Sequence, residues 1–416
     1  MMKTIMKTTL ASAILMSFTM SPVQANDSGS GFLNNIKVNG ELRPRYERVD
    51  EDNAKANANA FTNRLSIGVK ADLFGTDWLS GYAQMTDVHA LNNNYNSTDN
   101  GRSGNSVVAD PGQTRLTQSY LDFKYNKTLF RAGRQIVNLD NLRFIGSVNW
   151  RQMPQSFNAY ALVDHSIDNL SLLAAYVTQV NTVKTSNSGD YPTKTVLLHA
   201  KYKVMDALTL TGYGYMIGSV HNTFGLAATG KIAASGMGFK YRAEYATQND
   251  PTLETQNQGK PNVDADYFNL KLGMKMSSLL AGVQYELLSG SNGTDNKTAF
   301  STPLATLHAQ NGWADEFLGT PTAGLVDVNV MLGYKTKTFG VAKAIYHDFS
   351  SDEKSINYGT EFDLLYKRGI PNVKHLTGLV KAAIYRGGDS VAEGNTTKLA
   401  TNKNVFWVML DYKFSQ

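Results

Sequence analysis

The chain of 416 residues has no cysteine, few prolines and only 18% charged residues. Without cysteine it can form neither disulfides nor thiolate metal sites, so packing and hydrogen bonds must hold its fold. The formal net charge of +5 is too small to indicate a nucleic-acid-binding protein. Beyond the first 25 residues, no apolar run approaches the roughly 20 residues of a membrane-spanning helix.

The N-terminal stretch has the pattern of an export signal. Lys3 and Lys7 precede the uncharged apolar run LASAILMSFTM, and Val23 and Ala25 stand where a cleavage site needs small residues. The sequence therefore predicts a secretory signal peptide over residues 1–25. Residues 26–416 would then form a single mature domain outside the cytoplasm.

Strict alternation of apolar and polar residues is the main pattern of the rest of the chain. In TNRLSIGVKADLF, Leu65, Ile67 and Val69 fall on one side of an extended strand, and Arg64 and Lys70 fall on the other. The same period of two recurs in VLLHAKYKV, MGFKYRAEY, YFNLKLGMKM and YGTEFDLLYK. A period of two predicts β-strands with one apolar face and one charged face.

The connections between these strands tend to alternate between short and long. Short ones lie near residues 74–78, 126, 206, 277 and 336, and the long polar ones are residues 50–60, 89–114, 137–155, 181–192, 249–263, 290–324 and 387–402. Tight periplasmic turns and extended outer loops are typical of outer-membrane barrels. We therefore predict an all-β fold, a transmembrane antiparallel β-barrel of about 18 strands, with its apolar face toward outer-membrane lipid and its charged face toward the lumen.

The charged faces supply the candidate pore-lining residues. Rings of basic side chains favour anions, and basic residues exceed acidic ones on these faces. Alternatively, most of these basic residues stabilise the inner wall by pairing with acidic residues on neighbouring strands and have no role in selecting solutes. Arg43, Arg45 and Arg64, on the first two strands, are the strongest candidates for a contribution to the pore. The full set comprises Arg43, Arg45, Arg64, Lys70, Arg131, Lys201, Lys203, Lys240, Arg242, Lys271, Lys275 and Lys381.

The long connection over residues 137–155 is a candidate constriction loop. It contains Asp140, Arg143, Trp150 and Arg151. Long loops without regular structure are often functional, so this loop could fold inward and narrow the pore. In the alternative interpretation it is an outer loop that packs on its own aromatic residues.

Three segments carry a family resemblance. FRAGRQIVNLDNLRFIGSVNWRQMPQSFNAY from Phe130, FSTPLATLHAQNGWADEF from Phe300 and YGTEFDL from Tyr358 resemble the alginate export family and related proteobacterial outer-membrane porins. The resemblance implies an 18-stranded monomeric barrel with an electropositive lumen that passes acidic polysaccharide or other solutes. The final strand, NVFWVMLDYKF, resembles the C-terminal signal read by the barrel assembly machinery, which would be a partner during biogenesis.

These observations predict a porin in the bacterial outer membrane that passes small hydrophilic, anionic solutes. An export pore for an acidic polysaccharide such as alginate is the first alternative, and an outer-membrane enzyme or receptor barrel is the second. The sequence lacks the G-x-S-x-G element of hydrolases, and its seven histidines include no pair at metal-ligand spacing. We therefore expect no enzymatic activity, no metal and no cofactor.

Overall fold

The computed structural model describes residues 31–253, 262–294, 296–389 and 399–416, so the expected signal peptide lies outside the described residues. The described residues are mainly β-structure, and the helical elements named among them are a short turn, α2 (Ser186–Gly189), and a 3₁₀ turn, η1 (Leu307–Ala309). The strands are β1 (Leu33–Glu51), β2 (Ala58–Leu73), β3 (Leu79–Ala90), β4 (Gln113–Tyr125), β5 (Thr128–Gln135), β6 (Ser156–Asp164), β7 (Leu170–Asn181), β8 (Tyr191–Met205), β9 (Leu208–Ile217), β10 (His221–Ala234), β11 (Met237–Asn249), β12 (Asp264–Met276), β13 (Leu279–Leu288), β14 (Leu325–Thr336), β15 (Gly340–Ser350), β16 (Asn357–Gly369), β17 (Leu376–Gly387) and β18 (Lys403–Ser415).

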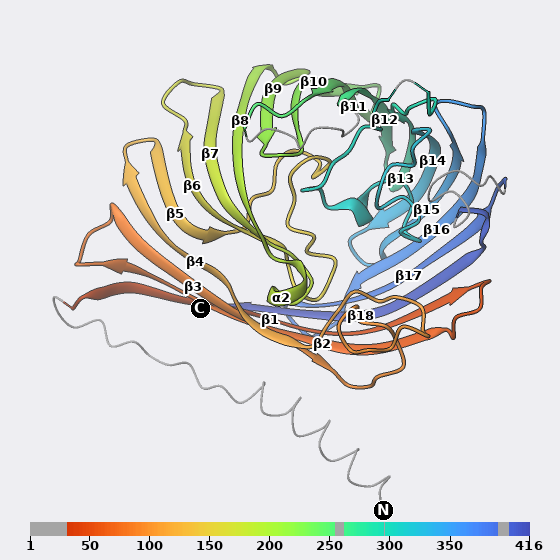
Figure 1. Ribbon diagram of the computed structural model, residues 1–416. Coiled ribbons are helices and arrows are strands. Elements are labelled where there is room, and N and C mark those ends of the chain that lie inside the picture. Colours follow the sequence, from red (N-terminus) through yellow and green to blue (C-terminus); the bar gives the residue numbers. More distant parts are fainter. Residues whose placement is uncertain (1–30, 254–261, 295, 390–398) are drawn as a thin grey trace, which may run out of the picture.

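The 18 strands form one closed antiparallel sheet, as predicted (Figure 1). Each strand pairs with its sequence neighbours, and the ring closes where β1 pairs with β18 as well as with β2. Closure leaves no sheet edge, so every strand can satisfy its backbone groups without water. At the seam, Gly40 lies opposite Phe414, and a Cβ on Gly40 would lie 2.2 Å from a carbon of the Phe414 ring. A glycine at position 40 therefore leaves room for the aromatic ring of Phe414 to lie over the seam between β1 and β18.

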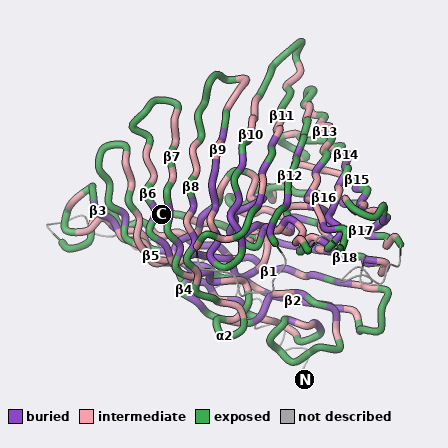
Figure 2. Tube along the Cα trace, turned by 45° about the horizontal axis from the view of Figure 1, so that its top comes forward, coloured by how far each residue is buried: buried purple, intermediate pink, exposed green. Residues whose placement is uncertain are grey.

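The outer face of the barrel is apolar. Leu65, Ile67 and Val69 on β2 are each about 40% exposed, as are many apolar residues at corresponding positions on the other strands. Aromatic residues, among them Trp78 and Tyr125, are exposed near the short turns, where the girdle of a membrane barrel lies. In Figure 2 the turn ends of β6 to β11 are largely exposed, and burial gathers further along the strands. The buried residues therefore lie at the height along the barrel axis where the loops fold into the lumen.

The two ends of the barrel carry different connections. The end with short turns, such as residues 206–207, 235–236 and 277–278, is the periplasmic end in this architecture. The opposite end carries the long loops, but residues 218–220 and 351–356 are short there, so the predicted alternation of loop lengths does not hold throughout. Among the described residues, no helix is both long and apolar enough to cross a membrane.

The lipid-facing assignment predicts opposite effects at two neighbouring positions of β12. Leu272 faces outward and is 48% exposed, whereas a Cβ on the inward-facing Gly273 would meet nothing closer than 3.9 Å. Leu272→Arg should lower the free energy of unfolding by up to about 2–4 kcal/mol, the cost of an arginine at the bilayer midplane, and Gly273→Arg should cost much less. Urea unfolding in lipid vesicles measures both. Equal losses would contradict the assignment of faces.

Candidate functional site

Residues 137–155, which we call the first loop, leave β5, enter the lumen and lie against the inner wall of β1 and β2 (Figure 1). Arg43 donates hydrogen bonds to the carbonyl oxygens of Asn149 at 2.9 Å and Arg151 at 2.6 Å. Arg45 donates to the carbonyl oxygen of Trp150 at 2.6 Å. These guanidinium groups thus satisfy loop carbonyls that have no secondary-structure partner.

The same contact is reinforced by side chains. Arg64 donates to Oδ1 of Asn149 at 2.6 Å, and Nε of Arg43 donates to Oε1 of Gln152 at 3.1 Å. Arg45 forms a buried ion pair with Asp110, which comes from the loop between β3 and β4. Although burial alone would raise the pKa of Asp110, Arg45 and Arg151 hold that pKa below its usual value. Asp110 is therefore charged and fixes Arg45 beneath the first loop.

Residues 289–324, the second loop, leave β13 and lie against an acidic part of the wall. Glu286 and Asp327 are directly opposite each other on β13 and β14, and Nδ2 of Asn311 donates to Glu286 at 2.6 Å and to Asp327 at 3.2 Å. The backbone N–H groups of Trp313 and Ala314 donate to Oε1 of Glu361 on β16. The acidic wall thus binds loop donors, whereas the basic wall binds loop acceptors.

The two loops join each other inside the lumen. Nη2 of Arg151 lies 2.8 Å from Asp315, and the Trp150 ring stacks on His308 with centroids 4.6 Å apart. Backbone bonds also cross between the loops, from Gly146 N–H to the Leu304 carbonyl at 2.9 Å and from Thr306 N–H to the Leu142 carbonyl at 3.0 Å. Together with Arg143, which contacts Glu286 and Asn311, these bonds connect the basic wall to the acidic wall.

A buried lysine lies where the loops meet. Nζ of Lys381 on β17 is 2.6 Å from Nε2 of His308, whose Nδ1 is 2.7 Å from Asp315. The same ammonium lies 3.8–5.1 Å from the ring centroids of Trp150, Trp313 and Trp407. Three indole faces stabilise a cation that has little access to water. Lys381 is only 4% exposed, so the loops cover this part of the inner wall.

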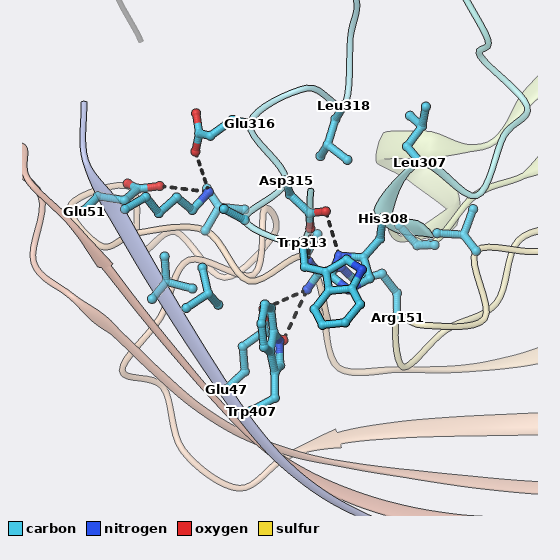
Figure 3. A pocket seen from close by; sticks show the side chains of 18 of the residues that line it. Glu47, Glu51, Arg151, Leu307, His308, Trp313, Asp315, Glu316, Leu318 and Trp407 are labelled. Atoms are coloured by element: carbon cyan, nitrogen blue, oxygen red, sulfur yellow. Dashed lines mark hydrogen bonds and ion pairs between the residues drawn. The ribbon is translucent and has the colours of Figure 1, made fainter. Parts of the chain in front are cut away.

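A cavity of about 730 Å³ lies on the outer side of this junction (Figure 3). His308, Trp313 and Trp407 are among its lining residues. Several of its charged groups pair with each other: Arg151 with Glu47 and Asp315, and Lys403 with Glu51 and Glu316. Between these pairs the lining is mainly apolar, with Val148, Leu307 and Leu318 among its residues. The cavity has the size of a small-solute pocket.

The predicted pore-lining residues lie on the inner face of their strands, but in three different environments. Arg43, Arg45, Arg64 and Lys381 are 1–4% exposed and covered by the loops, so they do not border open water. A second group pairs with a neighbouring side chain: Lys70 and Arg131 with Asp122, Lys201 with Asp140, Lys203 with Asp206, Arg242 with Glu244, and Lys271 with Gln284. Lys240 and Lys275 form no ion pair within the described part of the chain.

The four loop candidates lie inside the barrel and reach different walls. Asp140 contacts His199 at 2.8 Å and Lys201 at 3.4 Å on β8, and burial alone would raise its pKa, but His199 and nearby cations lower it. Arg143 reaches Glu286, whereas Trp150 and Arg151 lie at the junction of the loops. Their role in narrowing a conducting pore stays a prediction.

Sequence reasoning missed several residues that hold this arrangement. Gln152 is fully buried, and its Nε2 donates to the Arg43 carbonyl and to Oγ1 of Thr62. Asp110, His308 and Asp315 were not singled out either. Gln152 lies in the segment from Phe130, and His308 and Asp315 lie in the segment from Phe300, so the family resemblance of these segments is the one sequence signal that points to them. Among the described residues, no cluster of histidine and acidic side chains could hold a metal ion.

Comparison with known proteins agrees with the fold. The alginate export family matches residues 34–298. Among solved structures, OccAB2 of Acinetobacter baumannii superposes with a TM-score of 0.72 at 15% identity, covering 93% of this chain and 100% of that one. OpdK of Pseudomonas aeruginosa, solved with vanillate, gives 0.71 at 12% identity, and OccK8 (OprE) of the same organism gives 0.71 at 15%, each with the same coverage. No functionally curated sequence matches significantly.

The basic wall generates a prediction about the first loop. Changing Arg43, Arg45 and Arg64 together to Gln should release residues 137–155 from the wall, since their carbonyls lose charged donors and Asp110 loses its buried partner. Breaking one buried pair alone costs about 3–5 kcal/mol. Single-channel recording should show higher and noisier conductance, while the barrel stays heat-modifiable on gels. The matched variant Lys37→Gln, Lys70→Gln, Lys124→Gln should leave the noise unchanged, and an equal rise there would refute the anchoring role.

The His308 cluster generates a prediction about pH. Burial lowers the pKa of His308 to about 3, with Lys381 acting in the same direction and Asp315 against it. An unfolded or undocked His308 takes up a proton near pH 6.5, so acidification from there toward pH 3 favours release of the loop. Asp315 also favours release of the loop at the acid end of this range. Although burial alone would raise its pKa, His308 and Arg151 hold that pKa below its usual value, so protonation of Asp315 weakens the docked state.

Opening events in single-channel records should therefore become more frequent as the pH falls from 7 to 4. His308→Gln should flatten this dependence, because the neutral amide does not titrate. His165→Gln, which changes an exposed histidine in a periplasmic turn, should retain it. An unchanged pH profile in His308→Gln would show that this cluster does not control the junction.

Proposed function

The chain belongs to the alginate export family, and we propose that it is an outer-membrane porin for passive passage of small hydrophilic anions. The observation that carries the proposal is a closed membrane barrel whose lumen is narrowed by two mutually bonded loops rather than filled by a separate domain. The cavity of about 730 Å³ outside the junction would hold a small solute before passage.

The preference for anions is supported by the inner wall below the junction. Lys37 lies directly opposite Lys70, and Arg242 lies opposite Lys271. Like charges at such positions destabilise a sheet by about 0.2–1 kcal/mol per pair, so a wall stitched by opposite charges would avoid them. The excess of positive charge is the feature that would attract anions.

An export pore for an acidic polysaccharide is a second candidate, favoured by the family match over residues 34–298. A polymer would need a wider opening than the junction leaves, because Lys381, Arg45 and Trp407 are each at most 4% exposed. Release of uronate oligomers of graded length from liposomes separates the two candidates. A cut-off at one or two sugars supports the small-solute porin, and release independent of length supports the export pore.

The porin proposal predicts a specific electrical response. In a planar bilayer under a KCl gradient, the purified protein should conduct, and its reversal potential should indicate chloride over potassium. The preference should diminish as salt rises, since screening shortens the reach of each charge from about 10 Å at 0.1 M to about 3 Å at 1 M. A preference for potassium would refute the anion proposal, and the absence of conductance would favour a receptor or enzyme.

A further inference from the structure

Three lysines lie together on the inner wall near the periplasmic turns of β10, β11 and β12. Lys240 alternates with Phe239, which is 36% exposed to lipid, and Lys275 precedes Met276, which is 43% exposed. Lys231 precedes Ile232, which is 48% exposed. Because successive side chains on a strand point to opposite faces, all three lysines point into the lumen.

The register of the strands places these lysines close to one another. Lys231 is directly opposite Lys240, so their Cβ atoms are about 5 Å apart. Lys240 is opposite Gly273, two residues from Lys275, which makes Lys240 and Lys275 diagonal neighbours about 7–8 Å apart. The strand pairing thus places the three lysine side chains next to one another on the inner wall, so that their ammonium groups can approach the same ligand.

Among the described residues, no acidic side chain pairs with this cluster. In the part of the chain that the structure describes, Lys231, Lys240 and Lys275 form no ion pair. This differs from the outer side of the junction, where Arg151 contacts three carboxylates and Lys403 contacts two. Repulsion among the lysines is uncompensated within the protein, so a bound anion would relieve it.

The wall around the lysines is open. A Cβ on Gly238 would meet nothing within 4 Å, and one on Gly273 would meet only backbone oxygens, at 3.9 and 4.0 Å. A cavity of about 590 Å³ lies at the turns, lined by Gly238, Lys275, Ser235 and Ser277 among others. Small residues beside long cationic side chains leave room for a ligand to contact all three ammonium groups.

We propose that Lys231, Lys240 and Lys275 form a binding site for multivalent anions, carboxylate- or phosphate-bearing, at the periplasmic mouth of the channel. The inference rests on the proposed channel function, because it needs an aqueous lumen that a solute can enter. A monovalent anion would meet only one ammonium at a time, whereas an anion with several charges would bridge them. The site therefore makes the channel asymmetric, with capture from the periplasmic side.

Side-specific block of single-channel current tests the proposal. Orientation in the bilayer is assigned by Asn53→Cys in the loop between β1 and β2, because the chain has no other cysteine for an impermeant maleimide to label. Tripolyphosphate added on the periplasmic side should block chloride current at low salt, and addition on the outer side should do so at least about tenfold more weakly. Citrate in a second arm shows whether carboxylates serve as well as phosphates.

The triple variant Lys231→Gln, Lys240→Gln, Lys275→Gln should weaken periplasmic block by about tenfold or more. It removes repulsion, so the barrel should fold. The matched variant Lys55→Gln, Arg102→Gln, Lys184→Gln removes three exposed positive charges from the outer loops and should change block by less than about twofold. Gly273→Glu, which introduces a carboxylate into the open space among the lysines, should also abolish block without removing any of them.

Equal block from both sides, unchanged block in the β10–β12 triple variant, or an equal loss in the outer-loop variant would each overturn the proposal. A channel that conducts with chloride preference but shows no side-specific block would leave the porin function standing and remove only this site. A protein that does not conduct would refute the porin function itself.

Discussion

The structure depends on one constraint: in lipid, every backbone N–H and C=O group must find a partner within the protein. The closed ring of 18 strands meets it, and the seam between β1 and β18 completes the ring. Along each strand the residues that face lipid alternate with residues that face the lumen. Only the lipid-facing ones must be apolar, so the lumen-facing ones can be charged. Both walls that hold the loops, and the lysines near the periplasmic turns, follow from that freedom.

The loops use the same rule inside the barrel. A loop that enters a lumen carries peptide groups without a strand partner, and burial of such groups costs free energy unless they are bonded. Arg43 and Arg45 supply donors for the carbonyls of the first loop, and Glu361 supplies an acceptor for the N–H groups of the second. These three wall charges therefore compensate backbone groups that lie outside the strands, and the docked loops in turn cover the charges.

The sequence predicted the barrel because the period of two reports a local constraint, which each strand shows by itself. It predicted that residues 137–155 would be special because of their length, but left open whether they lie inside. The contacts that decide this connect distant positions, such as Arg43 with Asn149 and Arg143 with Asn311. No local pattern encodes them. Likewise, Lys381 was identified only by its charge, because its three tryptophan neighbours come from two loops and another strand.

Because the charges at the junction of the two loops are neutralised, we expect charge selectivity to arise elsewhere in the channel. Arg45, Arg151 and Lys381 are compensated by carboxylates, carbonyls or indole faces, so they contribute little net field to a passing ion. Uncompensated lysines lie nearer the periplasmic turns, on β10 to β12. Charges on a narrow, low-dielectric wall act strongly on ions within a Debye length. If the chain passes small anions, as we propose, the packing at the junction sets the size limit and the charge of the periplasmic wall sets the selectivity, so the two properties can be altered separately.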